Sequence, residues 1–471
     1  MSYFITGGTG FIGRHLIQKL LARPGTIHVL VRKSSKDKFD ALLAQMGFDP
    51  KRVVAVYGDL GKPRLGLSPT QVKQLAGKVK HLFHLAAIYD LTADEESQIR
   101  ANVDGTKHAM QLGVAVKAGC FHHVSSIAAA GLYPGVFKED MFDEAEGLDD
   151  PYFRTKHDSE GMVRREYPRP YRIYRPAIVL GHSQTGEIDK IDGPYYFFRL
   201  IKRMRALLPQ WVPTIGIEGS RLNMVPVDYV ADAMDWIAHK PGLDGHCFHL
   251  TDPAPQRVGE ALNTFARAAN APQMTMRVDA RMFAFVPPMV RGAIFNLPPV
   301  KRFTNMMLRD LGIPRQVLKY INYPTRFDSR ETERALKGSK IKLPKLESYA
   351  WRLWDYWERH LDPDLFIDRS LSGKVKGSTV LITGGSSGIG RAAAIKVAAA
   401  GARTIVVARK QDELDAVKAE IEKAGGTCFT YSADLAEMPA CDELVKKVLA
   451  EHETVDVLIN NAGRSIRRSV A

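Results

Sequence analysis

The chain is poor in cysteine and contains no long apolar run. Its 471 residues include four cysteines, and none of them forms a Cys-x-x-Cys pair. This usage excludes a disulfide framework and predicts reduced thiols in a reducing compartment. No segment approaches the roughly 18 consecutive apolar residues of a membrane span. The N-terminus, MSYFITGGTG, also lacks the basic and apolar regions of an export signal. We therefore expect a cytoplasmic protein.

Metal-ligand spacing is also absent. His122 and His123 are adjacent, but no cysteine or acidic residue stands at ligand spacing from them, so we expect no metal site. The net charge is +14, yet the basic residues are dispersed and no nucleic-acid-binding module is visible. We therefore expect no nucleic-acid partner. The charge favours an anionic cofactor and substrate, and secondarily a peripheral contact with a membrane surface. A homo-oligomer is left open.

Short apolar strands alternate with helical segments through the first part of the chain. One helix is expected over Gly13–Ala22, with its leucines and Ile17 on one face. Strands are predicted at Tyr3–Thr6, Ile27–Val31, Val53–Tyr57, His81–Leu85, Phe121–Val124 and Tyr171–Tyr174. This alternation predicts an α/β fold, namely a Rossmann-like, doubly wound parallel sheet with helices on both faces.

The sequence pattern changes twice along the chain. From about residue 190, aromatic residues and paired prolines predict a substrate-covering region that completes a first domain, residues 1–359. Residues 360–377 are typical of a linker. At Ser378 the segment STVLITGGSSGIG then repeats the N-terminal SYFITGGTGFIG. We expect residues 378–471 to form a second, incomplete Rossmann-like unit, truncated after four strands and ending in an exposed edge strand.

A glycine-rich turn lies between the first predicted strand and helix. Gly7, Gly10 and Gly13 permit a tight turn and the close approach of a pyrophosphate to the helix N-terminus. After the second strand, Arg32 and Lys33 replace the acidic residue of NAD-preferring sites and suit a 2′-phosphate. We therefore expect NADPH; two solvated surface cations are the alternative. The other expected contacts of this cofactor are Thr9, Phe11, Ile12, Asp59, Leu60, Ala86, Ala87, Tyr152 and Lys156. For Asp59, a turn at the strand end is the alternative.

Tyr152 and Lys156 stand four residues apart, which places them on one face of a helix. A lysine ammonium is expected to lower the pKa of the phenol, so that Tyr152 can donate its proton to the oxygen of a carbonyl under reduction. Ser126, after the strand Phe121–Val124, can hydrogen-bond the same oxygen. Strand alternation points Ser125 to the other side. An ordinary packed tyrosine is the alternative for Tyr152.

Taken in order, these motifs resemble those of the extended short-chain dehydrogenase/reductases. The resemblance covers roughly residues 1–250 through TGGTGFIG, HLAA, VSS, YFRTK, YRPAIVLG and VPVDYVADA. It implies that Asn102 helps to hold an active-site water. It also implies that Arg175 and Pro176 shape the cofactor pocket.

More narrowly, the chain resembles bacterial two-module fatty acyl-CoA reductases. The segments that carry this likeness are DGPYYFF, LPQWVPTIGIEG, NLPPVKR, INYPTRFDSRE and WDYWERHLDPDLF. The resemblance implies a long-chain acyl-CoA or aldehyde substrate. The side chains that could line an acyl tunnel are Phe197, Phe198, Trp211, Phe283, Phe285, Met289 and Phe295. Core packing is their alternative. The cations beside them, which suit an anionic head group or a membrane surface, are Arg199, Lys202, Arg203 and Arg205.

The second unit repeats the cofactor motif. Its expected contacts are Gly384, Ser386, Gly388, Ile389, Gly390, Arg409, Asp434 and Asn461. Arg409 again favours NADP. No Tyr-x-x-x-Lys pair follows these residues, so we expect this unit not to catalyse.

The sequence as a whole predicts NADPH-dependent reduction of long-chain fatty acyl-CoA, fatty aldehyde or both, toward the alcohol. Two alternatives remain. One is another reaction of the extended family, on a sterol or a nucleotide-sugar. The other is a non-catalytic NADP-binding scaffold.

Overall fold

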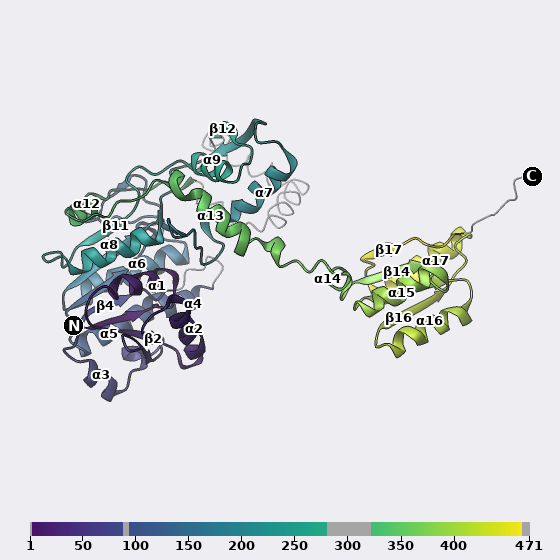
Figure 1. The fold of residues 1–471 in the computed structure, drawn as a ribbon, viewed down its shortest axis with the longest axis horizontal. Helices are drawn as coiled ribbons and strands as arrows, with labels where there is room; N and C mark the ends of the chain where they lie inside the picture. The colour runs from purple at the N-terminus through teal and green to yellow at the C-terminus, as the bar shows by residue number, and fades with distance from the viewer. Residues whose placement is uncertain (1, 88–93, 280–321, 464–471) are drawn as a thin grey trace, which may run out of the picture. The chain divides into compact units, whose positions relative to one another are not determined.

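The chain forms two compact units, Met1–Leu361 and Asp362–Ala471 (Figure 1). The computed structural model describes residues 2–87, 94–279 and 322–463. The second unit begins within the segment predicted as a linker, which also holds the short helix α14 (Leu371–Val375). No helix among the described residues is both long and apolar enough to cross a membrane.

The first unit is built on a seven-stranded sheet in the order β11-β7-β5-β4-β1-β2-β3. All neighbouring strands in it are parallel. The strands are β1 (Ser2–Thr6), β2 (Thr26–Val31), β3 (Val53–Tyr57), β4 (Val79–His84), β5 (Cys120–Val124), β7 (Tyr171–Pro176) and β11 (Cys247–Leu250). The strand order reverses between β1 and β4, and open α/β sheets bind ligands at such a reversal. This architecture confirms the Rossmann-like fold predicted from the sequence.

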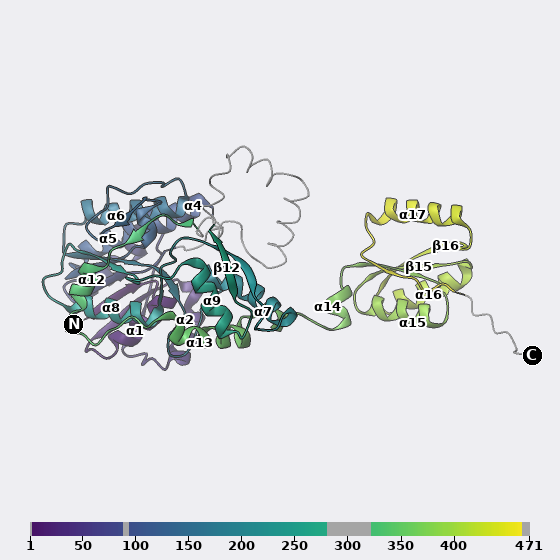
Figure 2. The ribbon, with the colours of Figure 1, turned by 90° about the horizontal axis from the view of Figure 1, so that it is seen from above.

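Helices cover both faces of this sheet. Figure 2 shows α1 (Phe11–Leu20) and α8 (Val227–His239) on one face, and α5 (Gly105–Ala115) and α6 (Pro151–Glu166) on the other. Along β1, Tyr3 and Ile5 pack with α1 and α8, whereas Phe4 packs with α5 and α6. Burial on both faces explains why the strand is continuously apolar. The remaining helices of this part are α2 (Lys36–Met46), α3 (Pro69–Leu75) and α4 (Glu95–Gln98).

The segments after β7 build a separate apolar cluster. It joins α7 (Phe198–Leu207), α9 (Val258–Ala268) and α13 (Leu346–His360). The ring centroid of Phe198 lies 4.9 Å from that of Phe265 and 5.1 Å from that of Trp354. Two short parallel pairs complete the region, β8 (Ile178–Leu180) with β10 (Met224–Pro226) and β9 (Thr214–Glu218) with β12 (Met274–Asp279).

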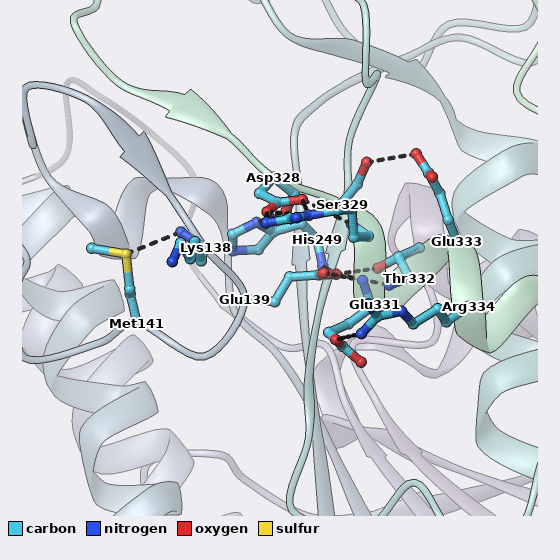
Figure 3. Close-up of polar contacts among 11 residues, drawn as sticks. Lys138, Glu139, Met141, His249, Asp328, Ser329, Glu331, Thr332, Glu333 and Arg334 are labelled. Carbon is cyan, nitrogen blue, oxygen red and sulfur yellow. Dashed lines mark hydrogen bonds and ion pairs between the residues drawn. The ribbon is translucent and has the colours of Figure 1, made fainter.

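The segment after the covering region is attached to the sheet by the buried carboxylate of Glu139. Strand β13 (Arg326–Phe327) pairs with β6 (Val136–Phe137), and helix α12 (Arg330–Leu336) follows. The Glu139 carboxylate, shown in Figure 3, accepts hydrogen bonds from the backbone N–H groups of His249 (2.8 Å), Glu331 (2.5 Å) and Thr332 (3.0 Å), and from Thr332 Oγ1 (2.6 Å). Glu139 thereby caps the first turn of α12 and fixes it to β11.

The second unit is a four-stranded parallel sheet in the order β16-β15-β14-β17. The strands are β14 (Thr379–Thr383), β15 (Arg403–Ala408), β16 (Thr427–Ser432) and β17 (Val457–Ile459). Helices α15 (Gly388–Ala399) and α16 (Gln411–Lys423) lie on one face and α17 (Met438–His452) on the other (Figure 2). Strand β17 lies at the edge of the described sheet, where the Leu458 side chain is exposed.

Candidate active site

The glycine loop of the first unit packs on the carboxyl end of β4. Gly7 has a φ of +70°, and a Cβ there would lie 2.7 Å from the backbone nitrogen of Ala86. A Cβ on Gly13 would lie 2.3 Å from the Gly7 carbonyl oxygen. The Ala86 N–H also donates to Thr6 Oγ1 at 3.3 Å. Only glycine fits at these two positions, and the loop sits where the strand order reverses.

Helix α1 begins at this loop without a side-chain cap. Its N-cap residue is Gly10, and its first turn carries no acidic side chain. The first N–H groups of a helix have no partner within the helix, and the helix dipole favours an anion at that end. A loop that excludes side chains, leading into an uncapped helix, fits the pyrophosphate of a dinucleotide.

A cavity of about 390 Å³ opens beside the loop. Its wall contains Gly7, Gly10 and Gly13 together with Ser126, Tyr152 and Lys156. The covering region supplies mainly apolar lining residues, which include Ile188, Tyr195, Phe197, Leu222, Leu262 and Tyr323. The structure therefore brings the predicted cofactor loop and the predicted proton-donating residues into one cavity.

Tyr152 lies in the first turn of α6. Asp150 caps this helix by accepting the Tyr152 N–H at 3.0 Å, and Pro151 occupies the first helical position. The Tyr152 side chain is buried, and burial raises its pKa to about 12, partly offset by a hydrogen bond with Ser126. The nearby carboxylate of Asp192 raises it further. The sequence predicted that Lys156 would lower this pKa; the pKa is raised instead, because burial and the carboxylates of Asp192 and Asp150 all raise it and the hydrogen bond with Ser126 offsets them only in part.

Lys156 is buried one turn further along α6. Burial lowers its pKa to about 8, and the Glu160 carboxylate partly opposes that shift. The Lys156 ammonium donates to the Val124 carbonyl oxygen at 3.5 Å. It therefore reaches the end of β5, beside the serine pair.

The two serines after β5 point in different directions. Ser126 is half-buried, lines the cavity and caps the short helix Ile127–Ala130 by accepting the Ala128 N–H at 3.2 Å. Ser125 is buried and donates to Glu160 Oε2 at 2.7 Å. The Ser125 side chain thus points away from Ser126, as strand alternation predicts, although Ser125 is also among the residues that line the cavity.

Asn102 lies behind the site. It belongs to a π-helical turn, Ile99–Asp104, and its amide donates to Thr155 Oγ1 at 3.2 Å. Thr155 Oγ1 in turn donates to the Tyr152 carbonyl oxygen at 3.3 Å. Asn102 thus contacts the helix that carries Tyr152 but is not among the described residues that line the cavity. The water implied by the resemblance stays a prediction.

Some of the other predicted cofactor residues line the cavity and others do not. Phe11, Ile12 and Ala87 line the cavity, whereas Thr9 is exposed. Leu60 is partly buried and packs against the apolar core next to Gly105 of α5. Arg32 and Lys33 are exposed after β2, where a 2′-phosphate would be reached. Asp59 accepts the Gly61 N–H at 2.9 Å, so the strand-end turn that the sequence left as its alternative is present.

The predicted acyl tunnel is only partly reproduced. Phe197 lines the cavity. Phe198 instead packs in the cluster with Phe265 and Trp354, and Trp211 is 81% exposed. These two assignments are wrong, because one side chain is core and the other faces solvent. Four predicted tunnel residues lie outside the described part of the chain: Phe283, Phe285, Met289 and Phe295.

Sequence reasoning missed three residues near the reacting groups. Asp192 and Tyr323 line the cavity, and burial raises the Asp192 pKa to about 6. Glu160 lies one turn beyond Lys156 on the same helix. The first two stand in segments that carried the family resemblance, and the third follows from helical spacing. Arg175, expected at the cofactor pocket, pairs with Glu160, while Pro176 lines the cavity.

The second unit holds its glycine loop in a similar way. Gly384 has a φ of +62°, and the Asn461 amide donates to the carbonyl oxygens of Gly384 (3.0 Å) and Thr383 (3.1 Å). Asn461 therefore supports the loop from behind. Other predicted contacts are exposed, namely Ile389, Arg409 and Asp434. Ser386 donates to Glu413 at 3.0 Å, Gly388 has open space around it, and Gly390 packs against the Gly384 carbonyl.

Two protein families match the chain. Residues 5–234 match the family described as "Male sterility protein". Residues 378–471 match the family described as "short chain dehydrogenase". The two matches fall on the two units of the structure.

Curated relatives and solved structures add detail. The glycine betaine reductase ATRR of Emericella nidulans is 29% identical over 98% of this chain and 37% of its own length. A fatty acyl-CoA reductase of Acinetobacter baylyi is 53% identical over 20% of this chain and 32% of its own length. The chain thus spans about a third of these two relatives.

The fold also matches solved reductase domains. The terminal R domain from the myxalamid PKS-NRPS biosynthetic pathway is similar with a TM-score of 0.60 and 24% identity, over 76% of this chain and 90% of that one. The reductase domain of a nonribosomal peptide synthetase from Mycobacterium tuberculosis gives 0.55 and 19%, over 76% and 91%. Residues 5–234 thus match a family of the extended short-chain dehydrogenase/reductase type and residues 378–471 match a short chain dehydrogenase family, and both units have a Rossmann-like parallel sheet.

Proposed function

We propose that the first module reduces the carbonyl group of a long-chain fatty acyl-CoA, a fatty aldehyde or both, with NADPH. Two observations support this proposal. One is the resemblance to bacterial two-module fatty acyl-CoA reductases, and the other is the match to a fatty acyl-CoA reductase over 20% of this chain. The observation that carries the proposal is the single cavity that joins the glycine loop, the Ser126–Tyr152–Lys156 group and an apolar wall. A pure binding protein has no need of a buried phenol and ammonium in the same pocket.

The residues of the loop would hold the cofactor. The uncapped α1 N-terminus would bind the pyrophosphate, and the exposed Arg32 and Lys33 would meet a 2′-phosphate. NADPH supplies a hydride when bound there. These two cations, in place of an acidic residue, are the reason to propose NADPH over NADH.

The chain's own groups then handle the proton. As hydride reaches the carbonyl carbon, negative charge develops on its oxygen, and Tyr152 donates its phenolic proton to that oxygen. Ser126 hydrogen-bonds the same oxygen, and the Lys156 ammonium stabilises the phenolate left behind. With a thioester the resulting hemithioacetal loses the thiol and gives an aldehyde; with an aldehyde the product is the alcohol.

Two assays test this assignment. NADPH consumption is measured with a long-chain aldehyde and with a long-chain acyl-CoA, and the aldehyde and alcohol products are quantified. Tyr152→Phe should reduce turnover by about 10²–10⁴-fold, because general acid catalysis contributes about that much. Equal rates for the wild-type protein and Tyr152→Phe would reject the proton-donor role. Activity on a sterol alcohol or a nucleotide-sugar alone would favour the alternative substrates.

A second candidate for the substrate is an acyl thioester carried on a carrier protein. This candidate is favoured by the relatives and structures whose names place them in nonribosomal peptide synthetases. The discriminating measurement compares kcat/KM for the same acyl group on coenzyme A and on a phosphopantetheinylated carrier protein. A higher value for the carrier-bound substrate would select this candidate.

We further propose that the first module contacts an anionic membrane surface through the tip around β9. Leu207, Trp211, Ile215 and Met276 are exposed there, and Ile215 and Met276 are paired across β9 and β12. Trp favours the membrane interface, and the cations of α7 suit anionic lipid. Trp211→Ser should weaken co-sedimentation with phosphatidylglycerol vesicles, whereas Trp351→Ser, at the other exposed tryptophan, should not. Equal losses for both variants would reject this contact.

A further inference from the structure

A buried carboxylate lies one helical turn beyond Lys156 and takes no part in the proposed proton transfer. Glu160 is fully buried, and its two oxygens accept four hydrogen bonds. Oε2 accepts from Ser125 Oγ at 2.7 Å and from Arg175 Nε at 2.9 Å. Oε1 accepts from Arg175 Nη2 at 2.6 Å and from Arg164 Nε at 2.8 Å. The acceptor positions of this carboxylate are therefore occupied by donors from α6, β7 and the end of β5.

Glu160 is an anion in this setting. Burial raises its pKa, but the charge and hydrogen bonds of Arg175, with smaller contributions from Arg164 and Ser125, hold the pKa well below its usual value. A buried ion pair is weak evidence for a stabilising role, because well-packed apolar side chains of similar volume can often replace both partners at no cost in stability. The position of this pair, directly behind the reacting groups, points to a role in the site.

Glu160 acts on two of the three reacting residues. Its hydrogen bond to Ser125 fixes the residue that directly precedes Ser126. Its negative charge opposes the burial that lowers the Lys156 pKa to about 8, and so favours the ammonium form. The other titratable groups that Lys156 affects are His84 and His123 on the adjacent strands, whose pKa values burial lowers so far that both are neutral.

The far end of the network reaches the covering segment. Arg175 Nη1 donates to His249 Nε2 at 3.1 Å, so the His249 proton lies on Nδ1, which donates to the Asp328 carbonyl oxygen at 2.7 Å. Figure 3 shows His249 beside both Asp328 and Glu139. Asp328 directly follows Phe327, which lines the cavity. One chain of contacts thus runs from Ser125 through Glu160, Arg175 and His249 to Asp328, which is next to the cavity residue Phe327.

We propose that Glu160 is a positioning residue of the reductase site. It holds Ser125, and through the backbone Ser126, and it keeps Lys156 protonated. Arg175 holds Glu160 in turn and connects it to the covering segment. Glu160 touches neither substrate nor cofactor, so it acts only through these neighbours. The inference rests on the proposed function in that Ser126, Tyr152 and Lys156 are taken as the reacting groups.

The test separates this role from a merely structural one. Glu160→Gln removes the charge, and Glu139→Gln is the matched control, since it alters a second buried carboxylate near the same network that does not act on Lys156. Two quantities are measured against pH: kcat/KM, and the reaction of the Lys156 amine with an acylating reagent, read by mass spectrometry. Glu160→Gln should lower both midpoints from about 8 by about one pH unit, the size expected for a nearby opposite charge. Glu139→Gln should leave them in place.

Two further variants keep the proposal testable if Glu160→Gln fails to fold. Glu160→Gln leaves Arg175 buried without its main partner, so Glu160→Gln/Arg175→Met removes both charges and should show the same labelling shift. Ser125→Ala keeps every charge and should lower kcat roughly tenfold with KM and both midpoints unchanged, because it loosens Ser126 by one hydrogen bond. Wild-type midpoints in the Glu160 variants would overturn the proposal, and wild-type kcat in Ser125→Ala would overturn the part of it that acts through Ser125 and Ser126.

The labelling measurement also separates the two levels of inference. It needs no substrate or cofactor, so the midpoint of Lys156 can be determined in a protein that reduces nothing. Absence of turnover on all carbonyl substrates would reject the proposed function. A labelling midpoint that does not move in Glu160→Gln would reject the role of Glu160.

Discussion

Replacing Glu139 tests how the covering segment is attached to the sheet. In Glu139→Ala the backbone N–H groups of His249 and Thr332 stay buried but lose their acceptor, and the Glu331 N–H is partly buried. A buried donor without a partner costs about 1–3 kcal/mol, so we expect the free energy of unfolding of the first unit to fall by about 4 kcal/mol. Glu139→Gln retains one acceptor oxygen and sets its amide against one N–H, which predicts a smaller loss of about 1–2 kcal/mol.

The assay is urea unfolding followed by tryptophan fluorescence. All five tryptophans of the chain lie between residues 211 and 357, so the signal reports the first unit alone. Glu333→Ala is the control, since Glu333 stands on the same helix with its side chain exposed and accepts a hydrogen bond from Ser329 Oγ at 3.2 Å; it should change stability by no more than about 0.5 kcal/mol. A loss in Glu139→Ala as small as in the control, or smaller than in Glu139→Gln, would refute the view that this carboxylate caps α12.

Three other outcomes follow from the site. Gly7→Ala should abolish NADPH binding, measured by nicotinamide fluorescence, because its Cβ meets the Ala86 nitrogen at 2.7 Å; Gly47→Ala, with a similar φ of +64° and open space around it, should bind normally and lose only about 1 kcal/mol of stability. The kcat/KM should fall as pH rises through about 8, where Lys156 loses its proton, while Tyr152, with a pKa of about 12, keeps its own; a flat profile to pH 10 would contradict this. Burial lowers the His123 pKa to about 3 in the folded protein, below about 6.5 in the unfolded chain, so the stability this neutral residue contributes is full above pH 6.5 and is lost as pH falls. His123→Phe should therefore lose about 2 kcal/mol less than the wild-type protein between pH 7 and pH 5 in urea unfolding, and equal losses would be the contrary result.

Much of the fold follows from local pattern. The strand Val53–Tyr57 was predicted with its observed bounds, because a short apolar run between turn residues has few other structures open to it. The glycine loop could be placed because glycine at these spacings marks a backbone that no other residue can follow. Tyr152 and Lys156 share a helix face because their spacing requires it.

The remainder depends on the tertiary structure. The pKa of Tyr152 could not be predicted from Lys156 four residues away, because it is raised by burial and by the Asp192 carboxylate, which lies 40 residues further along the chain. Phe198 and Trp211 are both aromatic residues of the predicted covering region. Phe198 packs against Trp354, whereas Trp211 faces solvent. The contact between Arg175 and His249 joins positions 74 residues apart, which no local pattern encodes.

The packing of Gly7 against Ala86 has a consequence for how the chain acquires its binding loop. The loop is closed by a strand some 80 residues downstream, and in the second unit Asn461 closes the loop of Gly384 from 77 residues away. Such contacts form only after a large loop of chain has closed, which makes them late and slow events in folding. A fragment comprising only β1, α1 and β2 would lack the contact of the glycine loop with Ala86. Affinity for a dinucleotide should therefore arise only when the sheet is completed.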